Sequence, residues 1–237
     1  MGTATRQALY NMDDIYEDEE ELDLDEALQS CQEDLTRYRD EGNRESEAET
    51  LEDMGDIYEL QGRSDEALVT YEQCLTIYRE LGDRSGQAET LMGMGNIYED
   101  EGRLQEALFA YQGSLALKRE LGDRDGEGQT LYNIGLAYEN QKRYDEALVA
   151  YKQCLAIYRE VNDQLGQGET LANIGDIYKS QGRWDEALTC VQQAVTLLES
   201  AEDTETLEWA RELLAYIEAQ SGKPQRQGLW GKIWGGH

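Results

Sequence analysis

A repeat with a strict period of 40 residues runs through most of the chain and constrains its fold more than any other feature. Aligned copies begin at residues 49, 89, 129 and 169, and a degenerate earlier copy comprises residues 8–16 and 25–38. A glycine, a tyrosine and an alanine recur in register: Gly55, Gly95, Gly135 and Gly175; Tyr58, Tyr98, Tyr138 and Tyr178; Ala67, Ala107, Ala147 and Ala187. Periods of this length indicate supersecondary units that bury their apolar faces against one another. The sequence therefore predicts a repeat array.

Each repeat predicts two amphipathic helices. Apolar or small residues are spaced i, i+3, i+4 and i+7, which places them on one helix face. In the second repeat they are Leu51, Met54, Gly55 and Tyr58 for the first helix, and Ala67, Tyr71, Cys74, Leu75 and Tyr78 for the second. The small Gly55 and Ala67 predict a close approach of the two helices, and we expect the repeated tyrosines to be packing residues.

The segments between the helices carry turn signals. Gln61-Gly62 predicts the end of a first helix, and Leu81-Gly82-Asp83 predicts the end of a second helix and the start of the next repeat. Gly82 suits the left-handed conformation that ends helices, and Asp83 is a candidate N-cap. Asp65 lies near the start of a second helix, where a carboxylate suits the positive end of the helix dipole.

The motif G-x-x-Y, followed by E/D-E-A-L and an aromatic residue four positions after the alanine, resembles the tetratricopeptide repeat (TPR). The 40-residue period and the repeated L-G-D-R linker resemble the longer subtype found in Pins, LGN, rapsyn and many bacterial proteins. This resemblance implies an all-α fold, a right-handed α-α superhelical solenoid of five TPR helical hairpins plus a C-terminal capping helix. It also implies that first helices line a concave surface. The family's common proline near the end of the second helix is missing, and no GoLoco motif follows, so nothing supports G-protein regulation of the Pins type.

The repeats divide the chain into three expected regions. Five repeats occupy residues 1–202, at approximately 3–40, 45–82, 85–122, 125–162 and 165–202. Residues 203–222 predict a capping helix with Leu207, Ala210, Leu214 and Ile217 on one stripe, because a solenoid must cover its last apolar face. We expect residues 223–237 to form a flexible, basic, tryptophan-containing tail.

The charge of the chain restricts its partners. The net charge is −30, and residues 1–60 hold 21 acidic and four basic side chains. Nucleic acids and anionic membranes require basic surfaces, so this charge argues against both. We expect a partner protein or peptide with basic and apolar residues.

The resemblance and the charge together predict a partner-binding groove on the first helices, on the stripe that does not pack. The candidate partner-binding residues are Tyr10, Asn11 and Asp14 in the first repeat; Glu49, Glu52, Asp53 and Asp56 in the second; Glu89, Met92, Asn96 and Glu99 in the third; Gln129, Tyr132, Asn133 and Leu136 in the fourth; and Asn173 and Asp176 in the fifth. Glu59 continues the same stripe in the second repeat.

We expect the protein to be an interaction scaffold whose acidic groove holds a peptide with Lys or Arg at one end and an aromatic or aliphatic residue at the other. Tyr132 and Leu136 would receive the apolar residue, and Asn133 and Asn173 would hold the peptide backbone. One alternative is a membrane-associated assembly factor anchored by the tail residues Leu229, Trp230, Lys232, Ile233 and Trp234. The tail is alternatively a ligand for an acidic groove of its own or a neighbouring chain. Two further alternative functions are a peptide-sensing regulator and an inert structural spacer.

The sequence offers little for catalysis or cofactors. The only histidine is His237, and no phosphate loop, dinucleotide fingerprint or zinc-ligand spacing occurs. We expect no enzyme activity, no cofactor and no metal site. The four cysteines form no CxxC pair, so we expect reduced thiols. Cys74 and Cys154 occupy the same repeat position two repeats apart, too far for a disulfide, and we expect them to fill the core. Without a secretory signal or a transmembrane stretch, we expect a cytoplasmic protein, peripheral to a membrane only if the tail binds one.

Overall fold

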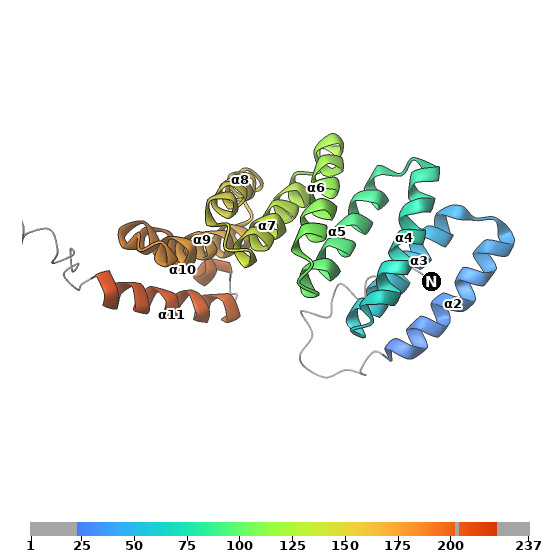
Figure 1. The fold of residues 1–237 in the computed structure, drawn as a ribbon, viewed down its shortest axis with the longest axis horizontal. Helices are drawn as coiled ribbons and strands as arrows, with labels where there is room; N and C mark the ends of the chain where they lie inside the picture. The colour runs from blue at the N-terminus through green and yellow to red at the C-terminus, as the bar shows by residue number, and fades with distance from the viewer. Residues whose placement is uncertain (1–22, 202–203, 222–237) are drawn as a thin grey trace, which may run out of the picture. The chain divides into compact units, whose positions relative to one another are not determined.

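The computed structural model of the protein describes residues 23–201 and 204–221, which form ten α-helices and no strands (Figure 1). The helices are α2 (Leu24–Glu41), α3 (Arg44–Leu60), α4 (Ser64–Leu81), α5 (Arg84–Asp100), α6 (Leu104–Leu121), α7 (Arg124–Asn140), α8 (Tyr144–Val161), α9 (Gln164–Ser180), α10 (Trp184–Ala201) and α11 (Thr204–Ser221). The predicted all-α repeat fold is confirmed. The helices group into two compact units, residues 1–142 and residues 143–237, and each is described by itself.

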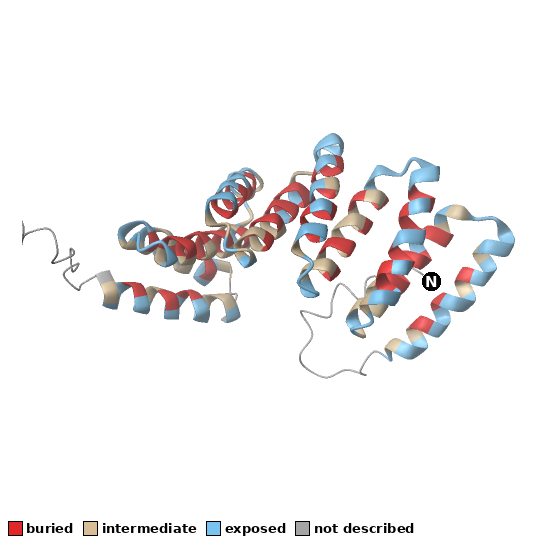
Figure 2. Ribbon diagram, in the orientation of Figure 1, coloured by how far each residue is buried: buried red, intermediate tan, exposed pale blue. Residues whose placement is uncertain are grey.

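In the first unit, helices that follow one another in the sequence pack against one another. The pairs α3/α4 and α5/α6 are the second and third repeats, while α2 packs on α3, α4 on α5 and α6 on α7. Figure 2 shows the buried residues in red on the helix faces that meet. The predicted stripes contribute to this core, with Leu51 from α3 and Tyr71 and Cys74 from α4 all 2% exposed or less. Ile57, which the predicted stripe of α3 did not include, is also fully buried.

The close approach predicted at the recurring glycine is present in the structure. A Cβ atom placed on Gly55 would lie 2.5 Å from Cε1 and 2.7 Å from Cδ1 of the Tyr71 ring. Ala67 of the same hairpin is fully buried. The glycine therefore allows the ring of the second helix to lie directly against the backbone of the first.

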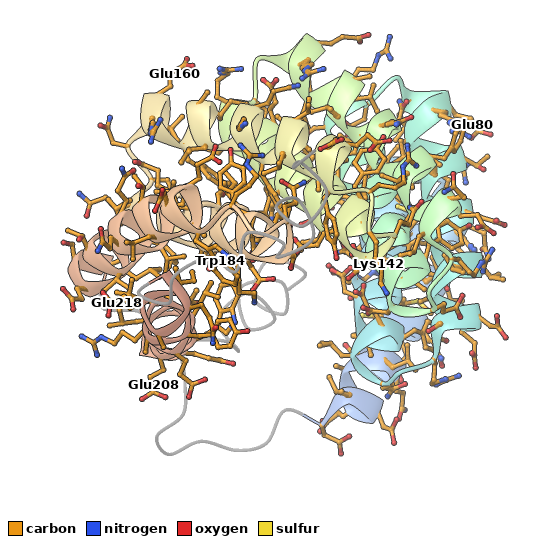
Figure 3. All side chains as sticks on the ribbon, turned by 60° about the vertical axis from the view of Figure 1, so that its left-hand side comes forward. Glu80, Lys142, Glu160, Trp184, Glu208 and Glu218 are labelled. Carbon is orange, nitrogen blue, oxygen red and sulfur yellow. The ribbon has the colours of Figure 1, made fainter. Side chains whose placement is uncertain are left out.

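In the second unit, α8 packs on α9, α9 pairs with α10, and α11 covers α10 and also touches α9. Ala210, Leu213 and Ile217 are the buried residues of α11, whereas Leu214 of the predicted stripe is only half-buried. Trp184 at the start of α10 and Tyr216 of α11 have ring centroids 6.5 Å apart. Figure 3 labels Trp184 together with Glu208 and Glu218, which are exposed on α11.

The predicted turn between repeats has the expected geometry. Gly82 has φ 73°, and the Asp83 amide donates to the Tyr78 carbonyl over 2.9 Å. The Asp83 carboxylate then accepts the amides of Ser85 (2.9 Å) and Gly86 (3.1 Å), which α5 leaves without helical partners. Among the described residues, no helix is long and apolar enough to cross a membrane.

We expect Asp83→Ala to lower the free energy of unfolding by about 1 kcal/mol, because it removes both acceptor bonds at the start of α5. Urea denaturation followed by circular dichroism measures this loss. The matched control is Asp100→Ala, which removes an exposed carboxylate from the other end of the same helix. A carboxylate there faces the negative end of the dipole, so the control variant should be as stable as the wild type or slightly more stable. Equal losses in the two variants would contradict the assignment of Asp83 as the cap.

Candidate functional site

Two buried tyrosines of the second helices direct their hydroxyl groups toward polar side chains of the first helices. Tyr71 and Tyr111 are each 1% exposed. The Tyr71 hydroxyl donates to Asp56 and lies 3.3 Å from Glu59 Oε2, both on α3. The Tyr111 hydroxyl lies 2.9 Å from both Asn96 Oδ1 and Glu99 Oε2 on α5. Each ring therefore packs in the core while its hydroxyl fixes an acidic or amide side chain at the surface of the hairpin.

Further hydrogen bonds connect the first helices to one another. Asn133 Nδ2 of α7 donates to Asn96 Oδ1 over 3.2 Å, and Asn140 Nδ2 donates to Glu99 Oε1 over 2.9 Å. Helices α3 and α5 are also in direct contact. Hydrogen bonds thus link α7 to α5, and packing links α5 to α3. We call the polar side chains on these three helices the polar strip. Its members are Asp56, Glu59, Asn96, Glu99, Asn133 and Asn140.

The polar strip concentrates negative charge where it is partly shielded from water. Burial, reinforced by the neighbouring Asp56 and Asp100, raises the pKa of Glu59 to about 7, although the Tyr71 hydroxyl opposes the shift. Burial also raises the pKa of Glu99, against the hydrogen bonds from Tyr111 and Asn140. The only basic residue of each strip helix is its first residue, Arg44, Arg84 or Arg124. The strip therefore favours a cationic group that would relieve the repulsion among its carboxylates.

Most of the predicted residues of the first unit are accessible. Glu49 and Gln129 are exposed, and the half-buried members are Asp56, Glu89, Met92, Asn96, Glu99, Tyr132, Asn133 and Leu136. Glu52 and Asp53 differ from the expectation that this stripe does not pack, because they are only 4% and 7% exposed. The Tyr78 hydroxyl packs over Glu52 and donates a 2.9 Å hydrogen bond to its Oε2.

Asp53 instead lies close enough to α2 to act on Cys31. Burial, with Asp53 and Asp34 in support, raises the pKa of the Cys31 thiol to about 11. The thiol is therefore protonated and unreactive at neutral pH. All four cysteines are free, and Cys74 and Cys154 are buried in the core as predicted.

The remaining predicted residues do not belong to the polar strip. Asn173 and Asp176 lie half-buried on α9 of the second unit, where Lys179 forms an ion pair with Asp176. That carboxylate is therefore neutralised within its own helix. Tyr10, Asn11 and Asp14 lie outside the described residues, as do the tail residues Leu229, Trp230, Lys232, Ile233 and Trp234.

Sequence reasoning missed Asn140 and the two tyrosine hydroxyls. The available signal was that tyrosine, with no phenylalanine in its place, occupies positions 71, 111 and 151. A buried tyrosine hydroxyl requires a polar partner, so this choice pointed to polar side chains on the facing helix.

Comparison with known proteins agrees with this architecture. The sequence profile of the Tetratricopeptide repeat matches residues 18–80 and 86–160, and a second profile with the same description matches residues 170–205. No curated protein matches the chain.

Solved structures share the fold at low sequence identity. The crystal structure of BtubC (BKLC) from P. vanneervenii has a TM-score of 0.63 and 16% identity, over 88% of this chain and 97% of that one. Aspartyl phosphate phosphatase F from Bacillus subtilis has a TM-score of 0.75 and 19% identity, over 84% of this chain but only 55% of that one. The apo form of RapI has a TM-score of 0.72 and 17% identity, over 93% of this chain and 65% of that one. At these identities the likeness concerns the fold alone.

Proposed function

Because the chain belongs to the tetratricopeptide-repeat family, we propose that it is a non-catalytic protein-interaction scaffold whose polar strip binds a basic segment of a partner protein. The observation that carries the proposal is the set of carboxylates that buried tyrosines hold in place on α3 and α5. Because these carboxylates are already held in place, less conformational entropy is lost when a ligand binds. A Lys or Arg of the partner would attract both Asp56 and Glu59 and offset the repulsion between their carboxylates.

The amides of the strip supply a second kind of contact. Asn96, Asn133 and Asn140 present donors and acceptors that suit the backbone of an extended peptide. Tyr132 and Leu136 lie half-buried on α7 and offer apolar surface beside these amides. A ligand with Lys or Arg over the carboxylates of α3 and an aliphatic or aromatic residue over Tyr132 and Leu136 of α7 would match these side chains.

The length of the strip sets the size of the ligand. Packed helices lie about 8–10 Å apart, so three first helices cover roughly 16–20 Å, or about five or six residues of extended peptide. We therefore propose a short linear segment as the ligand of this unit. Membrane docking and peptide sensing have no comparable support among the described residues.

A display library of randomised 12-residue peptides, selected against the full chain at low salt, tests the proposal. We expect enrichment of Lys or Arg together with one aliphatic or aromatic residue. Raising the salt from about 0.05 M to about 0.5 M should weaken binding at least about tenfold, because the attraction is partly screened. Glu59→Gln/Glu99→Gln should weaken it by a similar factor while leaving the helical content unchanged.

The matched control is Glu26→Gln/Glu120→Gln, which removes the same charge from exposed positions on α2 and α6. It should bind the selected peptides as the wild type does. Selection of acidic peptides, or equal losses in the strip and control variants, would exclude the polar strip as the binding site.

A further inference from the structure

A second binding surface lies in the first unit, between the second helices α4 and α6. It is a groove of about 600 Å³ with Leu91, Met94 and Tyr98 of α5 among its lining residues. Leu75 of α4 and Phe109 and Ala110 of α6 line it as well, and Glu72 and Glu106 add two carboxylates. The volume lies within the range of pockets that hold small ligands.

The groove and the polar strip use different faces of α5. Leu91, Met94 and Tyr98 are spaced i, i+3 and i+7, and Met92, Asn96 and Glu99 follow a second stripe. At about 100° per residue, the centres of the two stripes lie roughly 130° apart around the helix. A ligand in the groove therefore leaves the polar strip free.

The preceding repeat provides an internal comparison. A smaller hollow of about 420 Å³ lies between α2 and α4 beside Arg39, Arg44 and Glu47. Another of about 320 Å³ lies beside Tyr58 of α3 and Val69 of α4. Arg39 and Arg44 both bind Glu47, at 2.9 Å and 2.6 Å, so an ion-paired cluster lines the first hollow. The groove between α4 and α6 has more apolar side chains in its lining, although charged residues also border it.

Two sequence differences between the repeats contribute to this change. Gly113 of α6 stands where α4 has Gln73, whose side chain accepts a hydrogen bond from Arg39. Phe109 stands where α4 has Val69, and it is the only phenylalanine of the chain. Phe109 is 80% exposed, although its ring would bury a large apolar area in a contact. The groove therefore offers apolar side chains, an exposed aromatic ring and the carboxylate of Glu72, while Arg79 also lines it and Glu106 is paired with Arg103 at 3.2 Å.

The last ten residues of the chain have the complementary composition. Residues 222–237 follow α11 and contain Lys223, Arg226 and Lys232 but no acidic residue. Within residues 228–237, Leu229, Trp230, Ile233 and Trp234 provide large apolar side chains around Lys232. We infer that residues 228–237, which we call the tail peptide, dock in the α4–α6 groove, with the indole rings against Phe109 and Met94 and with Lys232 near Glu72.

The apolar groove suits the tail peptide better than the polar strip does. The tail peptide carries four large apolar side chains and one cation, whereas the strip offers mainly carboxylates and amides. Every molecule carries the tail peptide, so a groove of the same or of a neighbouring chain meets it without a third component. The inference is independent of the proposed function, because it involves a different face and a different ligand.

Fluorine NMR of the full chain labelled with 5-fluorotryptophan tests the inference. The chain has four tryptophans, and Trp184 and Trp209 on α10 and α11 serve as internal references. Single Trp→Phe variants assign the signals. In the wild type we expect the Trp230 and Trp234 signals to differ from those of a synthetic peptide of residues 223–237. In Phe109→Asp they should move to the peptide positions.

The control is Val69→Asp, which introduces the same charge at the equivalent exposed position one repeat earlier. It should leave all four signals where the wild type has them, as should Glu59→Gln/Glu99→Gln. Signals of Trp230 and Trp234 at the free-peptide positions in the wild type would overturn the inference. So would equal responses to Val69→Asp and Phe109→Asp, or a shift of these signals only on addition of phosphatidylglycerol vesicles.

Discussion

Gly55→Ala should lower the free energy of unfolding by about 1–3 kcal/mol, although alanine is the better helix former. The added Cβ would lie 2.5–2.9 Å from three atoms of the Tyr71 ring, which is 1% exposed and has no space to move into. Displacing the ring would also pull its hydroxyl away from Asp56 and Glu59. Thermal or urea denaturation of the variant measures the loss.

The same substitution at Gly113 provides the matched control. Gly113 also lies inside a helix, but its nearest neighbour for a new Cβ is Leu91 Cδ1 at 3.1 Å, the end of a half-buried flexible side chain. We expect Gly113→Ala to be neutral or to stabilise the protein by up to about 1 kcal/mol. If Gly55→Ala proves equally harmless, the close contact between glycine and tyrosine does not determine how the hairpin packs.

The fold was predictable because every local signal in the sequence agrees with the same repeat. The period of 40 residues, the helix stripes, the left-handed Gly82 and the capping Asp83 all have the predicted positions. The capping helix shows where such reasoning loses precision. Residues Leu213 and Leu214 are adjacent, and the packing of α11 on α10 and α9, which the sequence does not specify, leaves Leu213 as the buried one.

The candidate site was predictable only as a helix face. Periodicity identified the stripe that holds Asp56 and Asn96, but it carries no information on how neighbouring helices cover that stripe. Glu52 and Asp53 are buried because Tyr78 and the region of α2 reach over them. The α4–α6 groove likewise depends on side chains of three helices, so its only sequence signal was the single Phe109.

The raised pKa of Glu59 predicts a specific dependence of stability on pH. The folded state holds the Glu59 proton up to a pKa of about 7, whereas the unfolded chain releases it near 4.5. Between these values the native state binds more protons than the unfolded state, so the contribution of Glu59 to stability falls as pH rises through this window. At about pH 8 and above the loss is nearly complete, because the carboxylate is then charged in both states.

Glu59→Gln should therefore be more stable than the wild type by about 1–2 kcal/mol at pH 8, a value below the full linkage energy because Glu59 is partly exposed to solvent. Near pH 4 the two proteins should be equally stable, since both side chains are then neutral and both accept the Tyr71 hydroxyl. Urea denaturation at several pH values measures the difference in the free energy of unfolding. The other acidic residues of the chain are the same in both proteins, so their titration changes both stabilities alike.

Glu99→Gln, one repeat later, is the comparison. Because Tyr111 and Asn140 both donate to the Glu99 carboxylate and oppose the effect of burial, its gain at pH 8 should be smaller. A pH-independent difference between Glu59→Gln and the wild type would show that the Glu59 carboxyl titrates alike in the folded and unfolded states, and that Asp56 and burial do not hold its proton.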